Sequence, residues 1–362
     1  MTVLVTIQHP AHVHFFKHAI AELEANGRDV HVVARDNEVA VDLLDAYDIE
    51  HEVLASESDS LAQLAITQAT YEFRAVRYAR RIDPDVVTGI GGVTAAHTAA
   101  LVGAESVVFT DTEHAKLINH LTHPVAGRIV TPDCYTDDLG EKQVSYSGYH
   151  ELAYLHPDRF TPDPSALADL RVDPEDTFVV LRVSAWDSSH DVGASGFADL
   201  GEAVDRLEDA GATVLVTSEV PLPDRLERCR TSVPPEDMHH LLSYADLFVG
   251  EGATMASESA ALGTPAIYVN SLTMGYIDEL DTRYDLLARY PEAGSHDAAI
   301  EHAVDILESD DDGRWSSRRE RLLEEKRDTT DVILRALGAT VDDDMTTDSD
   351  RADGPTVATA DT

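Results

Sequence analysis

The sequence predicts an α/β protein built from two Rossmann-like domains with an interdomain cleft. Short β-branched runs alternate with helix-length amphipathic segments almost from the first residue. The runs that we expect to be strands are apolar throughout instead of alternating, which is typical of a parallel sheet covered on both faces. The β–α series then repeats after a proline-rich interruption, so two halves of similar size are expected.

The first half is predicted to form a Rossmann-like domain over residues 1–155. Glycine or proline follows several of its helices, as at Gly27 and Pro84, where a helix cannot easily continue. Strands are expected at 3–7, 30–34, 85–89, 106–109 and 128–130, and helices at 13–26, 38–47, 60–81 and 95–101.

The second half is predicted to begin after a linker at 156–174, which contains four prolines and several aspartates. A second Rossmann-like domain is expected over 175–310, followed by a terminal helical segment at 311–340. The aspartate-rich residues 341–362 lack periodicity, which predicts a disordered acidic tail. Strands are expected at 178–183, 214–217, 247–249 and 266–269, and helices at 197–210, 238–244, 255–262 and 298–307.

The composition indicates the salt conditions in which the protein works more than it indicates the ligand. The chain carries 68 acidic and 27 basic side chains, for a formal net charge of −41. Such a charge repels phosphate backbones and anionic membranes, which argues against nucleic-acid binding. Hydrophobic residues make up 43% of the chain and recur periodically, so an unfolded chain is excluded as well. A folded, acidic surface is typical of a halophilic protein, because about 1 M salt screens repulsion beyond ~3 Å.

Cysteine usage and apolar runs indicate the compartment. The two cysteines, Cys134 and Cys229, are too few for a disulfide framework and lack metal-ligand spacing. No apolar run approaches the ~18 residues of a membrane span, and the run at 3–7 lacks the basic flank of a signal peptide. We therefore predict a cytoplasmic protein that is not integral to a membrane.

Loops that follow strands are the candidate sites, because ligands of open α/β sheets bind beyond the carboxyl ends of the strands. His9, His12 and His14 follow the first predicted strand. Imidazoles that titrate near neutral pH can act as a general base, bind phosphate or ligate a metal. Capping of the following helix is the alternative interpretation.

Two further loops of the first half are candidate sites. Gly91 and Gly92 allow a ligand to approach the backbone closely before a helix N-terminus, although a tight turn explains them equally well. Asp111 and Glu113, with His114 beside them, form a candidate acid/base set at the end of the strand 106–109. Helix capping by Asp111 is the alternative.

In the second half, the loop after the strand 178–183 contains Arg182, Ser184 and His190. These residue types suit contacts with phosphate and hydroxyl groups, and an ordinary loop is the alternative.

The most specific loop is 250–258, which joins a strand to a helix through small residues. The backbone N–H groups of a helix N-terminus and the helix dipole bind diphosphates. Glu258, one turn into the helix, is predicted to accept hydrogen bonds from ribose hydroxyls, and stabilisation of the helix start is its alternative role. The predicted diphosphate-binding residues are Gly252, Ala253, Thr254 and Met255.

At these residues the chain resembles a known family, the archaeal domain-of-unknown-function 354 family. The resemblance extends over roughly residues 1–335 and implies membership without implying an activity. It is carried by the segments 8–17, 111–116, 148–157, 184–191 and 252–258.

More remotely, the family is similar to GT-B fold proteins, namely the N-acetylglucosaminyltransferase of peptidoglycan assembly and the non-hydrolysing UDP-N-acetylglucosamine 2-epimerase. Glu258 and the Leu-Gly-Thr-Pro at 262–265 match the helix that binds the nucleotide in those proteins. This resemblance implies a GT-B-like arrangement in which the last helix crosses back onto the first domain.

The two relatives imply different chemistry. Glycosyl transfer needs a base from the first domain, for which His9, His12 or His14 is the candidate, and stabilisation of the leaving diphosphate near Thr254. Epimerisation needs acids and bases near sugar C2 and C3, for which Asp111, Glu113 and His190 are candidates. The epimerase signature after the strand 85–89 is missing, because residues 91–94 hold no carboxylate.

We therefore predict a glycosyltransferase of glycan or cell-surface polysaccharide synthesis, without a metal or a cofactor. Its expected partners are a nucleotide diphosphate sugar, above all a UDP-sugar, and a glycan or lipid-linked acceptor. A sugar-nucleotide epimerase and a non-catalytic nucleotide-sugar-binding protein are the alternatives.

Overall fold

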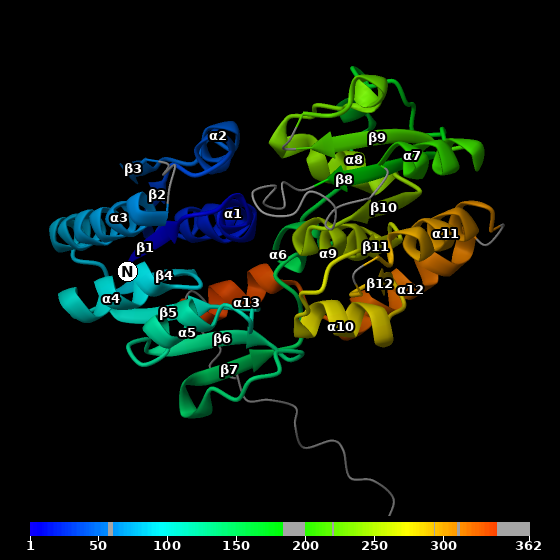
Figure 1. The fold of residues 1–362 in the computed structure, drawn as a ribbon. Helices are drawn as coiled ribbons and strands as arrows, with labels where there is room; N and C mark the ends of the chain where they lie inside the picture. Colours follow the sequence, from blue (N-terminus) through cyan, green and yellow to red (C-terminus); the bar gives the residue numbers. More distant parts are fainter. Residues whose placement is uncertain (57–60, 184–199, 219–220, 293, 310–311, 339–362) are drawn as a thin grey trace, which may run out of the picture.

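The computed structural model describes residues 1–56, 61–183, 200–218, 221–292, 294–309 and 312–338 (Figure 1). Its strands form two parallel sheets, one from each half of the chain, with helices packed on their faces. This arrangement confirms the predicted α/β fold. The tail expected at 341–362 lies outside the described residues.

The first sheet has the order β3-β2-β1-β4-β5-β6-β7, and its neighbouring strands are parallel. β1 is buried from Val3 to Ile7 because helices cover both faces of the sheet, which explains why its sequence does not alternate. The strands are β1 (Thr2–Ile7), β2 (Asp29–Arg35), β3 (Glu52–Ala55), β4 (Val86–Ile90), β5 (Glu105–Phe109), β6 (Arg128–Pro132) and β7 (Gln143–Tyr146).

Two layers of helices cover this sheet. Buried residues of α3 and α4 pack on one face, whereas those of α1 and α2 pack on the other. The helices are α1 (Pro10–Ala25), α2 (Ala40–Ala46), α3 (Leu61–Ile82), α4 (Val93–Val102), α5 (Lys116–Thr122) and α6 (Leu152–Leu155), with a 3₁₀ turn η1 at Gly140–Lys142.

The second sheet is smaller and has the parallel order β12-β11-β10-β8-β9. Its strands are β8 (Phe178–Val183), β9 (Thr213–Ser218), β10 (Leu247–Gly250), β11 (Ala266–Tyr268) and β12 (Leu287–Arg289). Its helices are α7 (Leu200–Asp209), α8 (Met238–Tyr244), α9 (Ala253–Leu262), α10 (Gly275–Thr282) and α11 (His296–Leu307), with 3₁₀ turns η2 (Pro164–Leu167), η3 (Asp224–Cys229) and η4 (Pro235–Asp237).

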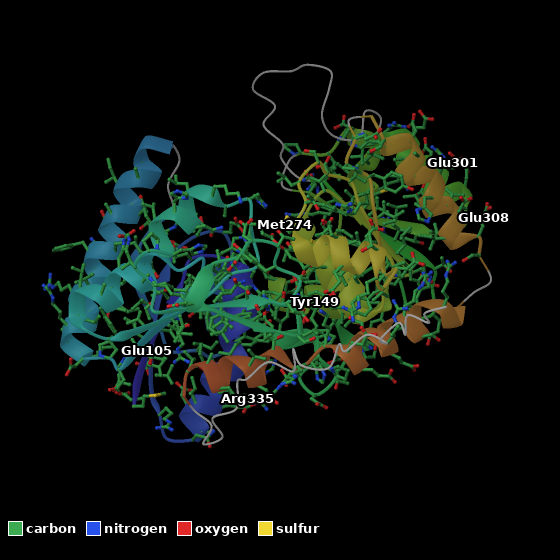
Figure 2. All side chains as sticks on the ribbon, turned by 90° about the horizontal axis from the view of Figure 1, so that it is seen from below. Glu105, Tyr149, Met274, Glu301, Glu308 and Arg335 are labelled. Carbon is green, nitrogen blue, oxygen red and sulfur yellow. The ribbon has the colours of Figure 1, made fainter. Side chains whose placement is uncertain are left out.

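The end of the described chain returns to the first domain. α12 (Asp312–Glu325) packs on α9, and α13 (Thr329–Ala336) packs on α1 and α6. The hydroxyl of Thr329 donates to the carbonyl of Tyr149 at 2.7 Å, and that of Thr330 to the carbonyl of Ala153 at 2.8 Å. Figure 2 shows Arg335 of α13 on the side of the first domain, with Glu301 of α11 on the side of the second.

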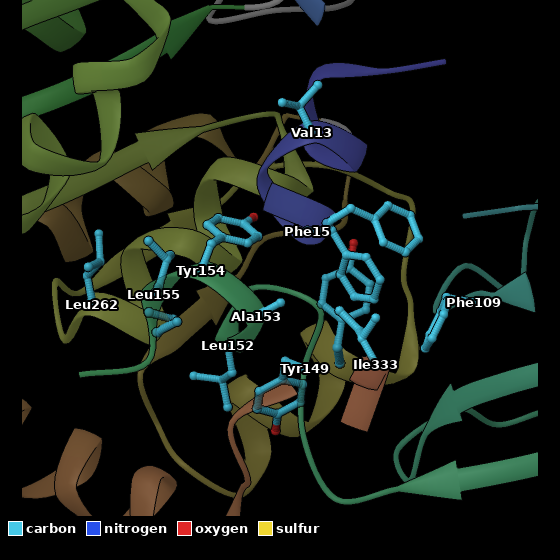
Figure 3. Packing of buried hydrophobic residues seen from close by; sticks show 14 of the residues in the cluster. Val13, Phe15, Phe109, Tyr149, Leu152, Ala153, Tyr154, Leu155, Leu262 and Ile333 are labelled. Atoms are coloured by element: carbon cyan, nitrogen blue, oxygen red, sulfur yellow. The ribbon is translucent and has the colours of Figure 1, made fainter. Parts of the chain in front are cut away.

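One cluster of buried apolar side chains continues from the first domain into the second. The short helix α6 lies within it, because all four of its residues are buried and it packs against α1, α9 and α13. Figure 3 shows Leu155 and Ala153 of α6 between Leu262 of α9 and Phe15 of α1. The two domains are therefore joined by a common core as well as by the chain.

Helix α1 begins at Pro10, earlier than the predicted start at residue 13. Nδ1 of His9 accepts a hydrogen bond from the N–H of Ala11 at 3.1 Å, so His9 caps the helix. Proline at the first helical position is favourable because its φ is already helical and a free N–H is not needed there.

Candidate functional site

A buried polar cluster lies where the first domain meets the second. It combines side chains that follow β5 and β7 with side chains of α6, α8 and α9. Burial makes an unmade hydrogen bond costly, so the partners within this cluster are informative. The junction cluster consists of Asp111, His150, Glu151, Tyr154, His239, Ser257 and Glu258.

Asp111 and His150 form an imidazole–carboxylate pair. Nδ1 of His150 lies 2.9 Å from Oδ2 of Asp111, and the hydroxyl of Thr112 donates to Oδ1 at 2.8 Å. Burial opposes ionisation of both groups, yet the pairing prevails: it lowers the pKa of Asp111 and raises that of His150. Nε2 of His150 is buried and has no hydrogen-bond partner among the described residues. A ligand that reached this nitrogen could therefore exchange a proton with it.

Glu151 joins the first domain to the second. Its Oε1 lies 2.6 Å from the hydroxyl oxygen of Ser257 in α9. Burial, followed by the nearby charge of Asp111, raises the pKa of Glu151 to about 7. Glu151 therefore keeps its proton to a higher pH than an exposed carboxyl group does.

Glu258, predicted to bind ribose, is engaged at the junction. Its Oε1 accepts hydrogen bonds from the hydroxyl of Tyr154 at 2.8 Å and from Nε2 of His239 at 2.9 Å. Its side chain is 6% exposed. Ribose binding by Glu258 stays a prediction.

The three N-terminal histidines lie in different surroundings. His9 caps α1 and lies 3.7 Å from Glu38. His12 accepts from the N–H of Gln8 at 3.4 Å, and burial lowers its pKa to about 3, so it is neutral at pH 7. His14 is buried, and its ring lies 4.5 Å from that of His239. Burial also lowers the pKa of His14, so His12 and His14 bind protons weakly at neutral pH.

Glu113 faces the second domain. Its Oε1 accepts from the N–H of Thr136 at 3.0 Å and from the N–H of Gly275, at the start of α10, at 3.2 Å. A Cβ at Gly275 would lie 1.9 Å from the carbonyl oxygen of Cys134, so the start of α10 packs closely on the first domain. Glu113 thus caps α10 across the junction.

Among the described residues, no N-cap side chain caps the first turn of α9. Gly252 occupies the N-cap position without a side-chain cap, and residues 252–255 are partly exposed. Ala253 and Met255 border the hydrophobic core, while the hydroxyl of Thr254 makes no hydrogen bond with a described residue. Free N–H groups at such a turn suit an anion, as predicted for the diphosphate.

Gly91 and Gly92 have a structural reason for being glycine. Both have positive φ, at 65° and 60°, and Gly92 is the N-cap of α4. A Cβ at Gly92 would lie 2.4 Å from a methyl carbon of Val108. The tight turn is therefore sufficient to explain this pair, and ligand binding there stays a prediction.

Gly92→Ala is expected to destabilise the fold by about 2–3 kcal/mol, since it combines a strained backbone with a steric overlap. Gly103→Ala is the matched control, because Gly103 has a φ of 86° and an added Cβ would meet no atom within 4 Å. Urea unfolding should show a clearly smaller loss for the control. Equal losses would mean that the contact with Val108 is unimportant.

The loop after β8 is only partly described. Arg182 is the fifth residue of β8 and has a partner within the protein. Ser184 and His190 lie outside the described residues. Their predicted contacts with the sugar nucleotide therefore stay predictions.

Within the described residues, one group of side chains has the spacing of a metal site, namely Asp133, Cys134 and Glu279. The ammonium group of Lys326 lies 2.7 Å from Asp133 and 2.8 Å from Glu279. It already provides the positive charge that a metal ion would bring, so we interpret this group as an ion-pair cluster.

Five members of the junction cluster were not predicted as site residues: His150, Glu151, Tyr154, His239 and Ser257. The first three belong to the segment 148–157, which carried part of the family resemblance. They follow the short edge strand β7, which was not predicted, so they were not recognised as residues at a strand end.

Known proteins resemble this chain in sequence or in fold. An uncharacterized protein of Methanocaldococcus jannaschii is 24% identical over 281 residues, which cover 74% of this chain and 81% of that protein. The UDP-GlcNAc 2-epimerase of Neisseria meningitidis, solved with UDP-GlcNAc, superposes with a TM-score of 0.64 at 13% identity, over 94% of this chain and 100% of that one. The glycosyltransferase VinC, solved with dTDP, gives 0.64 at 15% identity, over 93% and 99%.

These likenesses show the fold, which is the two-domain GT-B arrangement related to sugar-nucleotide enzymes. In the part of the chain that the structure describes, every helix is too short or too polar to cross a membrane. A family model described as "Protein of unknown function (DUF354)" matches residues 1–335. The chain therefore belongs to the DUF354 family.

Proposed function

We propose that this protein is a sugar-nucleotide-dependent glycosyltransferase of glycan or cell-surface polysaccharide synthesis. The observation that carries the proposal is the Asp111–His150 pair, whose Nε2 has no partner among the described residues. The next residue, Glu151, contacts α9, the helix whose first turn is open to a diphosphate. Solved proteins of the same fold hold UDP-GlcNAc or dTDP, which supports a nucleotide sugar as the donor.

In this proposal the second domain binds the donor. The diphosphate lies at the first turn of α9, where N–H groups and the helix dipole stabilise negative charge as it increases on the leaving group. Opening of the junction admits the acceptor, because Nε2 of His150 is buried in the closed arrangement.

The transfer itself needs one base and one leaving group. The acceptor hydroxyl gives its proton to Nε2 of His150 while its oxygen forms a bond to the anomeric carbon of the sugar. The bond between that carbon and the diphosphate oxygen breaks, and the nucleoside diphosphate leaves with the electron pair. Asp111 holds the imidazole in place and stabilises the imidazolium ion that forms.

Transfer is favoured over epimerisation because the two first-domain carboxylates suited to epimerisation are engaged. Asp111 is paired with His150, and Glu113 accepts N–H groups of Thr136 and Gly275. Asp111 stays paired with His150 when the junction opens, because both residues belong to the first domain, and residues 91–94 hold no other carboxylate.

The test is to incubate the protein with UDP-N-acetylglucosamine and other UDP-sugars at molar salt, with and without hydroxyl acceptors, and to follow them by ¹H and ³¹P NMR. Transfer releases UDP as a new glycosidic signal appears. Inversion at C2 without UDP release would identify an epimerase instead. A shift in melting temperature with neither change would indicate a binding protein, and no shift with any nucleotide sugar would contradict the nucleotide site.

Gly252→Ala is expected to weaken UDP binding about tenfold and to cost less than about 1 kcal/mol of stability, because alanine is a poorer N-cap than glycine. Gly252 has a φ of −90°, and an added Cβ would meet no atom of the described residues within 4 Å, so the methyl group is expected to intrude on the ligand. Gly313→Ala, in α12, is the control because its Cβ would also meet no atom within 4 Å. Calorimetric titration with UDP should separate the two variants, and equal affinities would place the diphosphate elsewhere.

A further inference from the structure

The hydroxyl of Ser257 has two oxygen neighbours, although it has a single proton to donate. Its oxygen lies 2.6 Å from Oε1 of Glu151 and 2.9 Å from the carbonyl oxygen of Thr254. A carbonyl and an ionised carboxylate both accept only, so they would compete for that proton. Both short contacts are satisfied together when Glu151 itself carries a proton and donates it to Ser257.

The charges around Glu151 favour this protonated form. Among the described residues, the cationic group that acts on Glu151 is the imidazole of His150, which is already paired with Asp111. An ionised Glu151 would therefore be a second carboxylate beside Asp111 in a buried place, which is costly. Consistent with this, its pKa is raised to about 7 by burial and by Asp111. The groups that face it are Asp111 after β5, Tyr146 of β7, His150, Tyr154 of α6, Ser257 of α9 and Tyr276 of α10.

We propose that Glu151 is a positioning residue that works as a neutral carboxylic acid: it donates to Ser257, Ser257 donates to Thr254, and the first turn of α9 is thereby fixed against the first domain. This chain joins the residue beside His150 to the turn where the diphosphate is proposed to bind. The inference rests on the proposed function for the identity of the ligand at that turn. When Glu151 ionises, the Ser257 hydroxyl donates to the carboxylate instead, so the carbonyl of Thr254 loses its donor and the turn is held less firmly.

The test compares the wild type with Glu151→Gln, whose amide group still donates but cannot ionise, and with Glu151→Ala, which cannot donate. Thermal unfolding is measured without nucleotide from pH 5.5 to 8.5. The folded-state pKa lies above the ordinary value, so the folded state holds the extra proton and loses stability as pH rises toward 7. The melting temperature of the wild type is expected to fall relative to that of Glu151→Gln over this range.

UDP is the probe for the position of the turn. We expect the affinity of the wild type for UDP to fall about tenfold between pH 6 and 8.5, that of Glu151→Gln to stay constant, and that of Glu151→Ala to be low throughout. Glu113→Gln is the matched control, because Glu113 is also buried but accepts N–H groups. It should lose stability without flattening the pH profile.

Two results would overturn the proposal: parallel pH profiles of unfolding for the wild type and Glu151→Gln, or equal UDP affinities of Glu151→Gln and Glu151→Ala. The unfolding comparison uses no nucleotide and no turnover. It can therefore succeed where no sugar transfer is found, and fail where transfer is found, which keeps this proposal distinguishable from the proposed function.

Discussion

Replacing His150 by glutamine is expected to lower the rate of sugar transfer by about 10²- to 10⁴-fold, the range that a general base contributes. The amide of glutamine can still donate to Asp111, but it cannot take a proton from an acceptor hydroxyl. UDP binding should be retained, because the diphosphate is proposed to lie on the second domain. The measurements are single-turnover kinetics for the rate and calorimetry for UDP affinity.

The pH profile provides a second readout of the same prediction. A base must be unprotonated to work, so transfer by the wild type should increase as pH rises through the raised pKa of His150. Asp111→Asn removes the partner that raises this pKa and should move the acidic limb to lower pH. His12→Gln is the control, because His12 is neutral near pH 7 and should leave the limb in place. If His150→Gln kept wild-type turnover while His12→Gln lost it, the base would be His12.

Replacing Lys326 by methionine is expected to destabilise the protein by about 2–3 kcal/mol, since it removes a buried cation from the largely buried Glu279, which keeps its ion pair with Arg283. The side chain of Lys326 is 1% exposed, and its ammonium group bridges Asp133 of the first domain and Glu279 of α10. Glu279 also accepts from the hydroxyl of Tyr149 at 2.6 Å. Urea unfolding measures the loss directly.

Lys116→Met is the matched control for this prediction. Lys116 forms an ion pair with Asp137 at 2.9 Å, a similar distance, but the two side chains are 68% and 43% exposed. Water and salt screen such a pair, so the control should lose less than about 1 kcal/mol. Similar losses in the two variants would show that burial does not determine how much Lys326 stabilises the protein.

Most of the fold was predictable because its strands are apolar on both faces. The expected strands at 3–7 and 247–249 agree with β1 and β10 to within a residue, and the expected helix at 238–244 coincides with α8. Glycines supplied some of the helix ends, as at Gly103 after α4 and Gly263 after α9. The start of α1 was missed because its cap is a histidine, a residue type that caps helices less often than serine or aspartate.

Elements at the edges of the sheets were harder to predict. β7 has three residues that are not fully buried, so its sequence, Gln-Val-Ser-Tyr, lacks the apolar run of a central strand. β12, at the edge of the second sheet, has three residues and was not predicted either. Short edge strands depend on their neighbour for stability, and this dependence is invisible in a local sequence window.

The candidate site was predictable in part. Asp111 was recognised because it follows an apolar strand, but its partner His150 follows β7, and only the order of strands in the sheet brings the two together. The contacts of Glu258 with Tyr154 and His239 were not predicted, whereas its binding of ribose stays a prediction. Those contacts depend on how the two domains are placed, which no local pattern specifies.

The position of α13 has a consequence for the synthesis of the protein. Thr329 bonds to Tyr149, which lies 180 positions earlier in the chain. At about 5–20 residues per second, a ribosome needs roughly 10–40 s to cover that interval. Throughout it, the apolar surface of α1 and α6 that α13 covers is exposed on the nascent chain. The domain that is made first is therefore completed last, and a chain that stops before α13 leaves an aggregation-prone surface uncovered.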